Sequence, residues 1–520
     1  MLTSIKKSRK LLTSLVGLIS AMILFQCIKY SSYPLPTDQP VVFDGSKKVI
    51  LYSGYNRYNL VNIQVQGNQF TCHRTVSHDN PKQPMGVEMH LYLNESYVLS
   101  PDSLGRITIP FETITHVEIQ DMDLAKTVLY SMGGMIGCVG IFFVGLLLTS
   151  CPFVYDFDGE QYQFAGEIYA GSVYPPLERH DYLVMPHLKE SDGTYKLKIT
   201  NEVREIQHTN LLDLIAVDHP HNSSVRFDKY GDIRTILEPE SPVSAVSNGE
   251  YDILSLIEER DDELFISEAP LGSDALMDSI VLRFQKPANT SNAKLIMQGR
   301  NSLWLDHVYG VLAEKIGKKY ETWQSKQADK SRDELIETTL AQGIPMSVYL
   351  DEGNGWEMVD YFNIAGPLAT KEDVLNLDLS QVEGDFVNIK LTFGHLFWEI
   401  DKLAMDFTPD IPVHQTSLTL TQAISQDGTD IHGLVNQDDG EYYVQSEIGD
   451  SAELVYESIP KPNELKRTFL LHSKGHYKVI RENTSEPDLV QLSKYQKPGG
   501  LLEFSRDHMN DLMESIASRK

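Results

Sequence analysis

Two short polar stretches hold the side chains that could perform acid–base chemistry. LERHDY brings Glu178, His180 and Asp181 together on one short segment, and a neighbouring carboxylate can orient a histidine as a general base. LLHSKGHY places His472 beside Ser473, but such a serine becomes a nucleophile only where a carboxylate and oxyanion donors converge on it. A charged surface loop and a hairpin turn are the simpler interpretations of the two stretches. We therefore keep Glu178, His180 and Asp181 as ligand-contact candidates and assign no catalytic residue.

Metal ligands and cofactor motifs are sparse. His219 and His221 flank a proline, but no third ligand follows at a recognisable spacing, and a turn explains them better. Asp156 and Asp158 could open a calcium loop, yet the remaining ligand positions of an EF-hand are missing. The sequence has no G-x-S-x-G elbow, phosphate-binding glycine loop, H-E-x-x-H pair or dinucleotide fingerprint. We expect no metal site and no cofactor.

One aromatic side chain is expected on the surface. Trp356 follows the turn Asn354–Gly355, and a tryptophan at a hairpin tip can stack on a sugar or on a protein partner. Trp304, Trp323 and Trp398 are expected in the core instead. Trp356 is therefore a further ligand-contact candidate.

The elements that must position these side chains are mostly strands. KKVILYS, LVNIQV and MHLYL are rich in β-branched and aromatic residues, and they predict a small β-barrel domain over residues 44–125. After residue 151, Asp-Gly and Asn-Gly turns recur between aromatic or β-branched residues. This pattern predicts a β-rich domain over residues 151–300 and a β-sandwich, jelly-roll-like domain over residues 346–500. The predicted fold class is mainly β.

Helical periodicity is confined to a few places. Apolar residues recur at helical spacing in LWLDHVYGVLAEKI, and they predict a helical insertion over residues 301–345. Ser505 is expected to cap a final helix within residues 501–520. Its apolar face is expected to dock on its own domain.

Two apolar segments precede this region. A basic run and an uncharged stretch predict a signal peptide or N-terminal membrane anchor at residues 1–28, and a linker at residues 29–43. The uncharged run around residues 128–148 would cover roughly 30 Å as a helix, and it predicts a transmembrane helix over residues 126–150. Gly133 and Gly137 have the GxxxG spacing of self-associating helices, although they could equally loosen a glycine-rich helix.

Cysteines mark the ends of both apolar segments. Cys27 follows Phe25 and Gln26, which are larger than the small residues that a lipoprotein signal prefers. Cys151 ends the better lipobox pattern, Leu-Thr-Ser-Cys, at an internal position where such signals do not occur. Both are lipidation candidates, and the interfacial end of a membrane helix is the simpler interpretation of Cys151.

Net charge and flanking charges bear on partners and location. The chain carries a formal net charge of −28, and an acidic chain repels phosphate backbones, so nucleic acid is not an expected partner. Lys126 precedes the second apolar segment and acidic residues follow it, which favours an outside location for residues 151–520. Two spanning helices would instead return that region to the cytoplasm.

Two resemblances extend this picture. The glycine-asparagine turn followed by RITIPFETITHVEI resembles a small membrane-proximal β-barrel module of bacterial envelope proteins, and the likeness covers residues 44–120. SCPFVYDFDGEQYQF, LERHDYL and RTFLLHSKGHY are similar to a family of large uncharacterised bacterial envelope proteins. The second resemblance implies an extracytoplasmic, mainly β domain that begins at Ser150–Cys151–Pro152, and it implies no activity and no functional residues.

These observations predict a membrane-anchored bacterial envelope protein. The expected function is that of a non-enzymatic scaffold or binding module whose partners are the membrane and another envelope protein or a glycan, with self-association through the second apolar segment as a further option. The alternative is a cell-surface hydrolase acting on glycans or peptides, with carboxylates supplied by LERHDY or HSKGHY.

Overall fold

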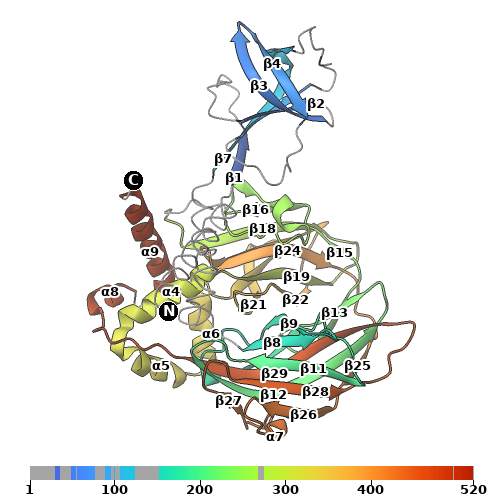
Figure 1. Ribbon diagram of the computed structural model, residues 1–520, viewed down its shortest axis with the longest axis vertical. Coiled ribbons are helices and arrows are strands. Elements are labelled where there is room, and N and C mark those ends of the chain that lie inside the picture. Colours follow the sequence, from blue (N-terminus) through green and yellow to red (C-terminus); the bar gives the residue numbers. More distant parts are fainter. Residues whose placement is uncertain are drawn as a thin grey trace, which may run out of the picture. The chain divides into compact units, whose positions relative to one another are not determined.

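The chain divides into two compact units, Met1–Val144 and Gly145–Lys520. The computed structural model describes residues 30–34, 48–53, 56–76, 88–94, 99, 106–122, 152–267, 274–495 and 497–518. Strands dominate both units, as Figure 1 shows.

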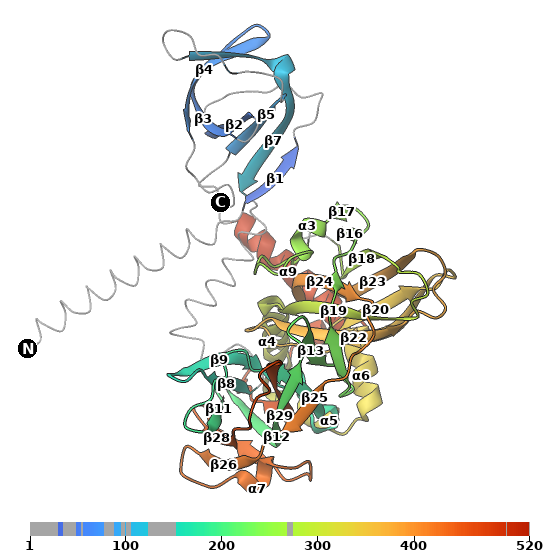
Figure 2. The ribbon, with the colours of Figure 1, turned by 90° about the vertical axis from the view of Figure 1, so that its right-hand side faces the viewer.

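The first unit is built on one curled sheet (Figure 2). Its strand order is β1-β7-β5-β2-β3-β4-β6, and β2 and β5 run parallel while the other pairs are antiparallel. The strands are β1 (Tyr30–Pro34), β2 (Lys48–Ser53), β3 (Asn56–Gln66), β4 (Gln69–Val76), β5 (Glu88–Leu93), β6 (Arg106–Pro110) and β7 (Ile114–Met122). Gly67 adopts a positive φ in the predicted turn between β3 and β4. Leu51, Phe70 and Leu91 are fully buried inside the curl.

The second unit contains two stacked sandwiches. The first sandwich joins the sheet β26-β28-β11-β8-β9 to the sheet β10-β29-β12-β25, with β27 also paired to β12. Its strands are β8 (Phe153–Phe157), β9 (Tyr162–Glu167), β10 (Arg179–Val184), β11 (Thr194–Thr200), β12 (Glu205–His219), β25 (His414–Ser417), β26 (Leu420–Ser425), β27 (Tyr443–Gln445), β28 (Ser451–Glu457) and β29 (Lys466–Val479). Both sheets contribute to one apolar core, which includes Leu197, Leu214, Leu454 and Leu471. A hairpin of β13 (Ser224–Phe227) and β14 (Ile233–Ile236) packs on its outer side.

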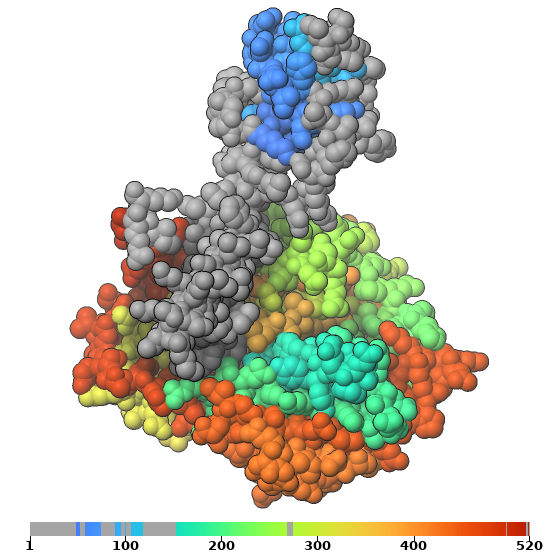
Figure 3. Space-filling model, in the orientation of Figure 1, coloured from blue at the N-terminus to red at the C-terminus, as the bar shows by residue number. Residues whose placement is uncertain are grey.

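The second sandwich lies within the first in chain order. Its sheets are β15-β24-β19-β22 and β17-β16-β18-β23-β20-β21. The strands are β15 (Pro239–Glu240), β16 (Ser244–Ser247), β17 (Tyr251–Asp252), β18 (Met277–Gln285), β19 (Asn292–Asn301), β20 (Met346–Asp351), β21 (Trp356–Phe362), β22 (Lys371–Asp378), β23 (Phe386–Gly394) and β24 (Trp398–Asp406). Each sandwich thus closes only with strands that are distant in sequence. In Figure 3 the teal and green surface of early residues lies beside the orange and red surface of late residues.

Helices gather at one side of the two sandwiches (Figure 1). The insertion between β19 and β20 forms α4 (Leu303–Ile316), α5 (Tyr320–Ala328) and α6 (Arg332–Ala341), and the segment after β29 forms α8 (Leu489–Lys494) and α9 (Gly500–Ala517). Short helices α3 (Leu254–Ile257) and α7 (His432–Val435) lie elsewhere. Ser302 and Ser331 cap α4 and α6 by accepting hydrogen bonds from backbone N–H groups.

The predicted cap of the final helix is wrong. The helix α9 begins at Gly500, so Ser505 lies inside it. The Ser505 hydroxyl accepts a hydrogen bond of 2.9 Å from the indole of Trp304 on α4. The Ser505 hydroxyl thus provides the hydrogen-bond acceptor for the buried indole N–H of Trp304, and this contact joins α9 to α4 of the same unit.

The fold-class prediction is confirmed as mainly β with few helices and is corrected on the transmembrane helix. Within the part of the chain that the structure describes, no helix is long and apolar enough to cross a membrane. The helix α9 has 18 residues but is charged along its length, whereas a span needs about 20 mainly apolar residues. The predicted span at residues 126–150, with Gly133 and Gly137, lies outside the described residues, as do Cys27 and Cys151.

Candidate functional site

The two polar stretches singled out in the sequence lie on neighbouring strands. LERHDY forms β10 and LLHSKGHY forms part of β29, and the two strands pair antiparallel. The register places His180 opposite Lys474, Asp181 opposite Ser473 and Tyr182 opposite His472. Because side chains alternate between the faces of a sheet, the two stretches contribute jointly to each face.

A network of charged and ring side chains covers the outer face. His180 Nδ1 lies 2.9 Å from His472 Nε2. The Lys474 ammonium donates to Asp438 at 2.6 Å and lies 3.5 Å from Glu178. His476 Nδ1 lies 3.6 Å from the other oxygen of Glu178. The two carboxylates therefore share one ammonium group.

The surroundings of Glu178 and His472 in this outer network lower the pKa of both side chains. Burial would raise the pKa of Glu178, but His476, Tyr442 and Lys474 together hold it below its usual value. Burial and the neighbouring His180 lower the pKa of His472 to about 4. Glu178 is thus ionised and His472 neutral at pH 7, which leaves Glu178 without a proton to donate.

Asp181 lies on the opposite face and has a structural role. It is buried, it accepts a hydrogen bond of 2.7 Å from the backbone of Tyr169, and it pairs with Lys371 at 2.6 Å. Lys371 belongs to β22, so this ion pair joins the two sandwiches. Asp373 lies 3.2 Å from the same ammonium group.

Trp356 begins β21 of the second sandwich. Its side chain is exposed, and the Lys390 ammonium lies 5.0 Å from the centre of its ring. The structure therefore does not bring it together with Glu178 and His180 as one site. Of the other tryptophans, Trp304 and Trp398 are buried as expected.

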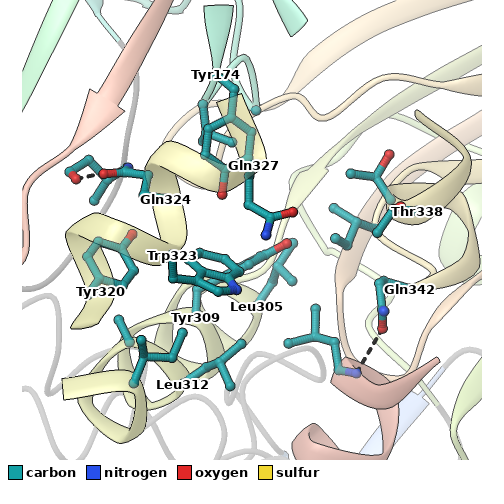
Figure 4. A pocket seen from close by; sticks show the side chains of 18 of the residues that line it. Tyr174, Leu305, Tyr309, Leu312, Tyr320, Trp323, Gln324, Gln327, Thr338 and Gln342 are labelled. Atoms are coloured by element: carbon teal, nitrogen blue, oxygen red, sulfur yellow. Dashed lines mark hydrogen bonds between the residues drawn. The ribbon is translucent and has the colours of Figure 1, made fainter. Parts of the chain in front are cut away.

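A cavity of about 550 Å³ lies between the helices and the first sandwich. Its apolar wall comes mainly from α4, α6, α8 and α9, including Leu305, Leu312, Leu335, Leu492 and Phe504. The α5 helix adds Tyr320, Trp323, Gln324 and Gln327, and Figure 4 shows the indole of Trp323 near the middle of this group. Tyr477 and Val479 of β29 and Tyr174 complete the wall.

Two amide side chains fix the cavity walls. The Gln324 amide donates to the backbone carbonyl of Val479 at 3.1 Å, which holds α5 on β29. The Gln342 side-chain oxygen accepts from the backbone N–H of Leu501 at 2.8 Å, which holds the start of α9 beside α6 (Figure 4). These two hydrogen bonds fix the positions of α5 and α9, which border the cavity.

The predicted helical insertion over residues 301–345 contains α5, but the sequence analysis did not identify the cavity that this insertion borders. The signal was present, since residues 320, 323, 324 and 327 have the spacing of one helix face. Tyr309 retains 37% of its accessible surface although it sits between helices, because its side chain borders the cavity. Among the described residues, no group of three or more His, Cys, Asp or Glu side chains could hold a metal ion.

Comparisons with known proteins find only distant likenesses. No family model matches the sequence, and no curated protein matches it. An α-xylosidase of family GH31 from Xanthomonas citri aligns at 8% identity over 83% of this chain and 38% of that chain, with a TM-score of 0.16. A turret protein with a triple jelly roll from an archaeal virus aligns at 8% identity over 66% of this chain and 93% of that chain, with a TM-score of 0.13. The arabinofuranosyltransferase AftD from Mycobacteria aligns at 11% identity over 89% of this chain and 38% of that chain, with a TM-score of 0.17.

The chain spans 38% of the length of both the xylosidase and the arabinofuranosyltransferase. At these TM-scores the likenesses carry no argument about fold or function.

Proposed function

We propose that residues 152–518 form a non-enzymatic binding module that holds an elongated apolar ligand in the cavity. The observation that carries the proposal is the cavity itself, whose 550 Å³ lie within the roughly 300–1,000 Å³ usual for small-molecule sites. The exposed surface of its wall is mainly apolar, although amide, hydroxyl and charged side chains also border it. Such a wall favours a ligand that is largely hydrocarbon, because burial of apolar surface drives its binding.

The alternative is a hydrolase that uses the outer network on β10 and β29. It is favoured by the pairing of the two predicted stretches. Hydrolysis of a glycosidic bond needs one protonated and one ionised carboxyl group, whereas Glu178 is held ionised and shares Lys474 with Asp438. Binding in the cavity is therefore the better supported function.

The proposed location is the bacterial envelope, with this unit outside the cytoplasm. The location rests on the basic and apolar pattern of residues 1–28 and on the resemblance to bacterial envelope proteins. An exported module that carries an apolar ligand would contact a membrane surface or another envelope protein to load and release it.

Fluorescence titration with N-phenyl-1-naphthylamine, whose emission rises in apolar sites, tests the proposal. We expect the full chain to bind the probe saturably. Replacing Leu312 with Trp places a larger side chain in the cavity wall, and we expect Leu312→Trp to weaken probe binding by about tenfold or more. Leu368→Trp is the matched control, because Leu368 is exposed and lies outside the cavity wall.

Far-ultraviolet circular dichroism of both variants establishes that they are folded. If the unaltered chain shows no saturable binding, or if a folded Leu312→Trp variant binds as tightly as the control, the cavity is not a ligand site and the proposal is wrong.

A further inference from the structure

The charged residues that border the cavity are mainly basic, whereas the chain as a whole is acidic. The sequence has 73 acidic and 45 basic residues, so an average surface would present more carboxylates than cations. The cavity wall instead includes Lys319, Lys326 and Arg481, with Asp306 as its acidic residue. A local excess of positive charge on an acidic protein attracts anions to that place.

The side chains of these three cations have no ion-pair partner among the residues that the structure describes. Neighbouring basic residues are paired, since Lys315 lies 3.9 Å from Asp488 and Lys318 pairs with Glu486 at 2.5 Å. In contrast, Lys319, Lys326 and Arg481 form no ion pair or hydrogen bond with any described residue. Arg481 is half-buried, and an arginine partly removed from water gains most from a bidentate partner such as a carboxylate.

Glu205 does not neutralise Arg481. It is 1% exposed, and its side chain shares a sheet face with that of Val479, its partner on β29, which borders the cavity. Burial raises the pKa of Glu205 to about 8, so it is mainly protonated at pH 7. The Glu205 carboxyl group is therefore not a counter-ion of Arg481 at pH 7.

Hydroxyl donors gather near the same cation. Tyr174, Tyr309 and Tyr320 all border the cavity, and none of the three hydroxyls has a hydrogen-bond partner among the described residues. Burial raises the pKa of Tyr320 while the charge of Arg481 opposes the rise, and burial together with Tyr320 and Tyr309 raises the pKa of Tyr174. The hydroxyls thus stay protonated as donors, and they lie near one another and near Arg481.

We propose that the cavity selects a single-chain anionic amphiphile, a long-chain carboxylate, whose head group is bound by Arg481 and the tyrosine hydroxyls and whose chain lies along the apolar wall. This inference rests on the proposed function and names the ligand class of the same site. Lys319 and Lys326 are exposed and add long-range attraction for the anion. The volume of the cavity favours one hydrocarbon chain over the two of a diacyl lipid.

Three ligands with the same chain and different head groups test the inference. Dodecanoate, dodecanol and dodecyltrimethylammonium are titrated into the full chain at pH 7, with displacement of N-phenyl-1-naphthylamine as the readout. We expect dodecanoate to bind about tenfold or more tightly than dodecanol, and dodecyltrimethylammonium to bind most weakly. We expect Arg481→Gln to abolish the preference for dodecanoate over dodecanol.

Arg204→Gln is the matched control, because Arg204 is paired with Glu482 and lies outside the cavity wall. It should retain the full preference for dodecanoate. Equal affinity for dodecanoate and dodecanol, or a preference that survives Arg481→Gln, overturns the anionic head-group assignment and leaves the cavity as an apolar site. Failure of all three ligands and of the probe to bind overturns both this inference and the proposed function.

Discussion

Glu205 makes the stability of the protein depend on pH in an unusual direction. This carboxyl group is 1% exposed on β12. One oxygen accepts a hydrogen bond of 2.7 Å from the Gln207 amide, and the other has no hydrogen-bond partner among the described residues. Burial raises its pKa from 4.5 to about 8, and the nearby carboxylates of Glu167 and Asp306 add to the rise. The folded protein therefore keeps a proton that the unfolded chain releases.

The sign and size of the effect follow from proton linkage. Between pH 4.5 and 8 the folded state binds more protons at Glu205 than the unfolded state, so the free energy of unfolding falls as the pH rises. One pKa unit corresponds to about 1.4 kcal/mol, and the loss between pH 5 and pH 8 is on the order of 3 kcal/mol. Glu205→Gln keeps the shape of the side chain and removes its titration. We expect the variant to be more stable than the unaltered chain at pH 8 by that order, and by much less at pH 5.

Thermal unfolding from pH 5 to pH 8, followed by circular dichroism, measures this difference. Glu457→Gln is the matched control, because Glu457 is exposed at the end of β28. Its Tm should follow that of the unaltered chain at every pH. A Tm difference between Glu205→Gln and the unaltered chain that stays constant from pH 5 to pH 8 would refute the assignment of a protonated Glu205.

Three further changes probe other contacts. His307 and His508 share a hydrogen bond of 2.9 Å between α4 and α9, and burial lowers the pKa of both side chains. Acidification below about pH 6.5 should therefore loosen the packing of α9 on α4. We expect a change in tryptophan emission in this pH range, and we expect His508→Gln to abolish it. Lys371→Met leaves two buried carboxylates without their cation and should cost about 3–5 kcal/mol of unfolding free energy in urea. Gly475→Ala would place a methyl group 2.5 Å from a backbone oxygen and should destabilise the protein by about 1–3 kcal/mol, whereas Gly310→Ala in α4 meets no atom within 4 Å and should stabilise it by about 0.5–1 kcal/mol in the same assay.

The strands and their hairpins were predictable because their signals are local. Asp158–Gly159 lies in the turn between β8 and β9. The Asp158 side chain accepts hydrogen bonds from the backbone N–H groups of Glu160 and Gln161. The helices α4 and α6 likewise follow from apolar spacing, serine caps and Gly343 at a positive φ. Each of these features depends on residues within a few positions of one another.

The pairing of distant strands was not predictable in this way. The long ladder of β12 with β29 joins residues 247 to 274 positions apart, and nothing near either strand specifies the other. The same limit applies to the polar stretches, because alternation alone places His180 and Asp181 on opposite faces but does not say which face is buried. Asp181 is structural because it accepts from the Tyr169 backbone and pairs with Lys371 of the second sandwich, and both partners are distant from it in sequence.

The cavity as a whole was not predictable either, because local patterns indicate its helices but not their assembly around a common space. Its wall combines α4, α5 and α6, inserted between two strands of the second sandwich, with α8 and α9, which follow the last strand of the first sandwich. Arg481 reaches it from the segment directly after β29, and Tyr174 from the loop before β10. A residue that borders the cavity on one element therefore has its neighbours in the cavity wall on elements that are far away in the sequence. For the same reason, the cavity exists only when both sandwiches and both helical segments have assembled, so the proposed ligand binding would be coupled to the folding of the whole unit.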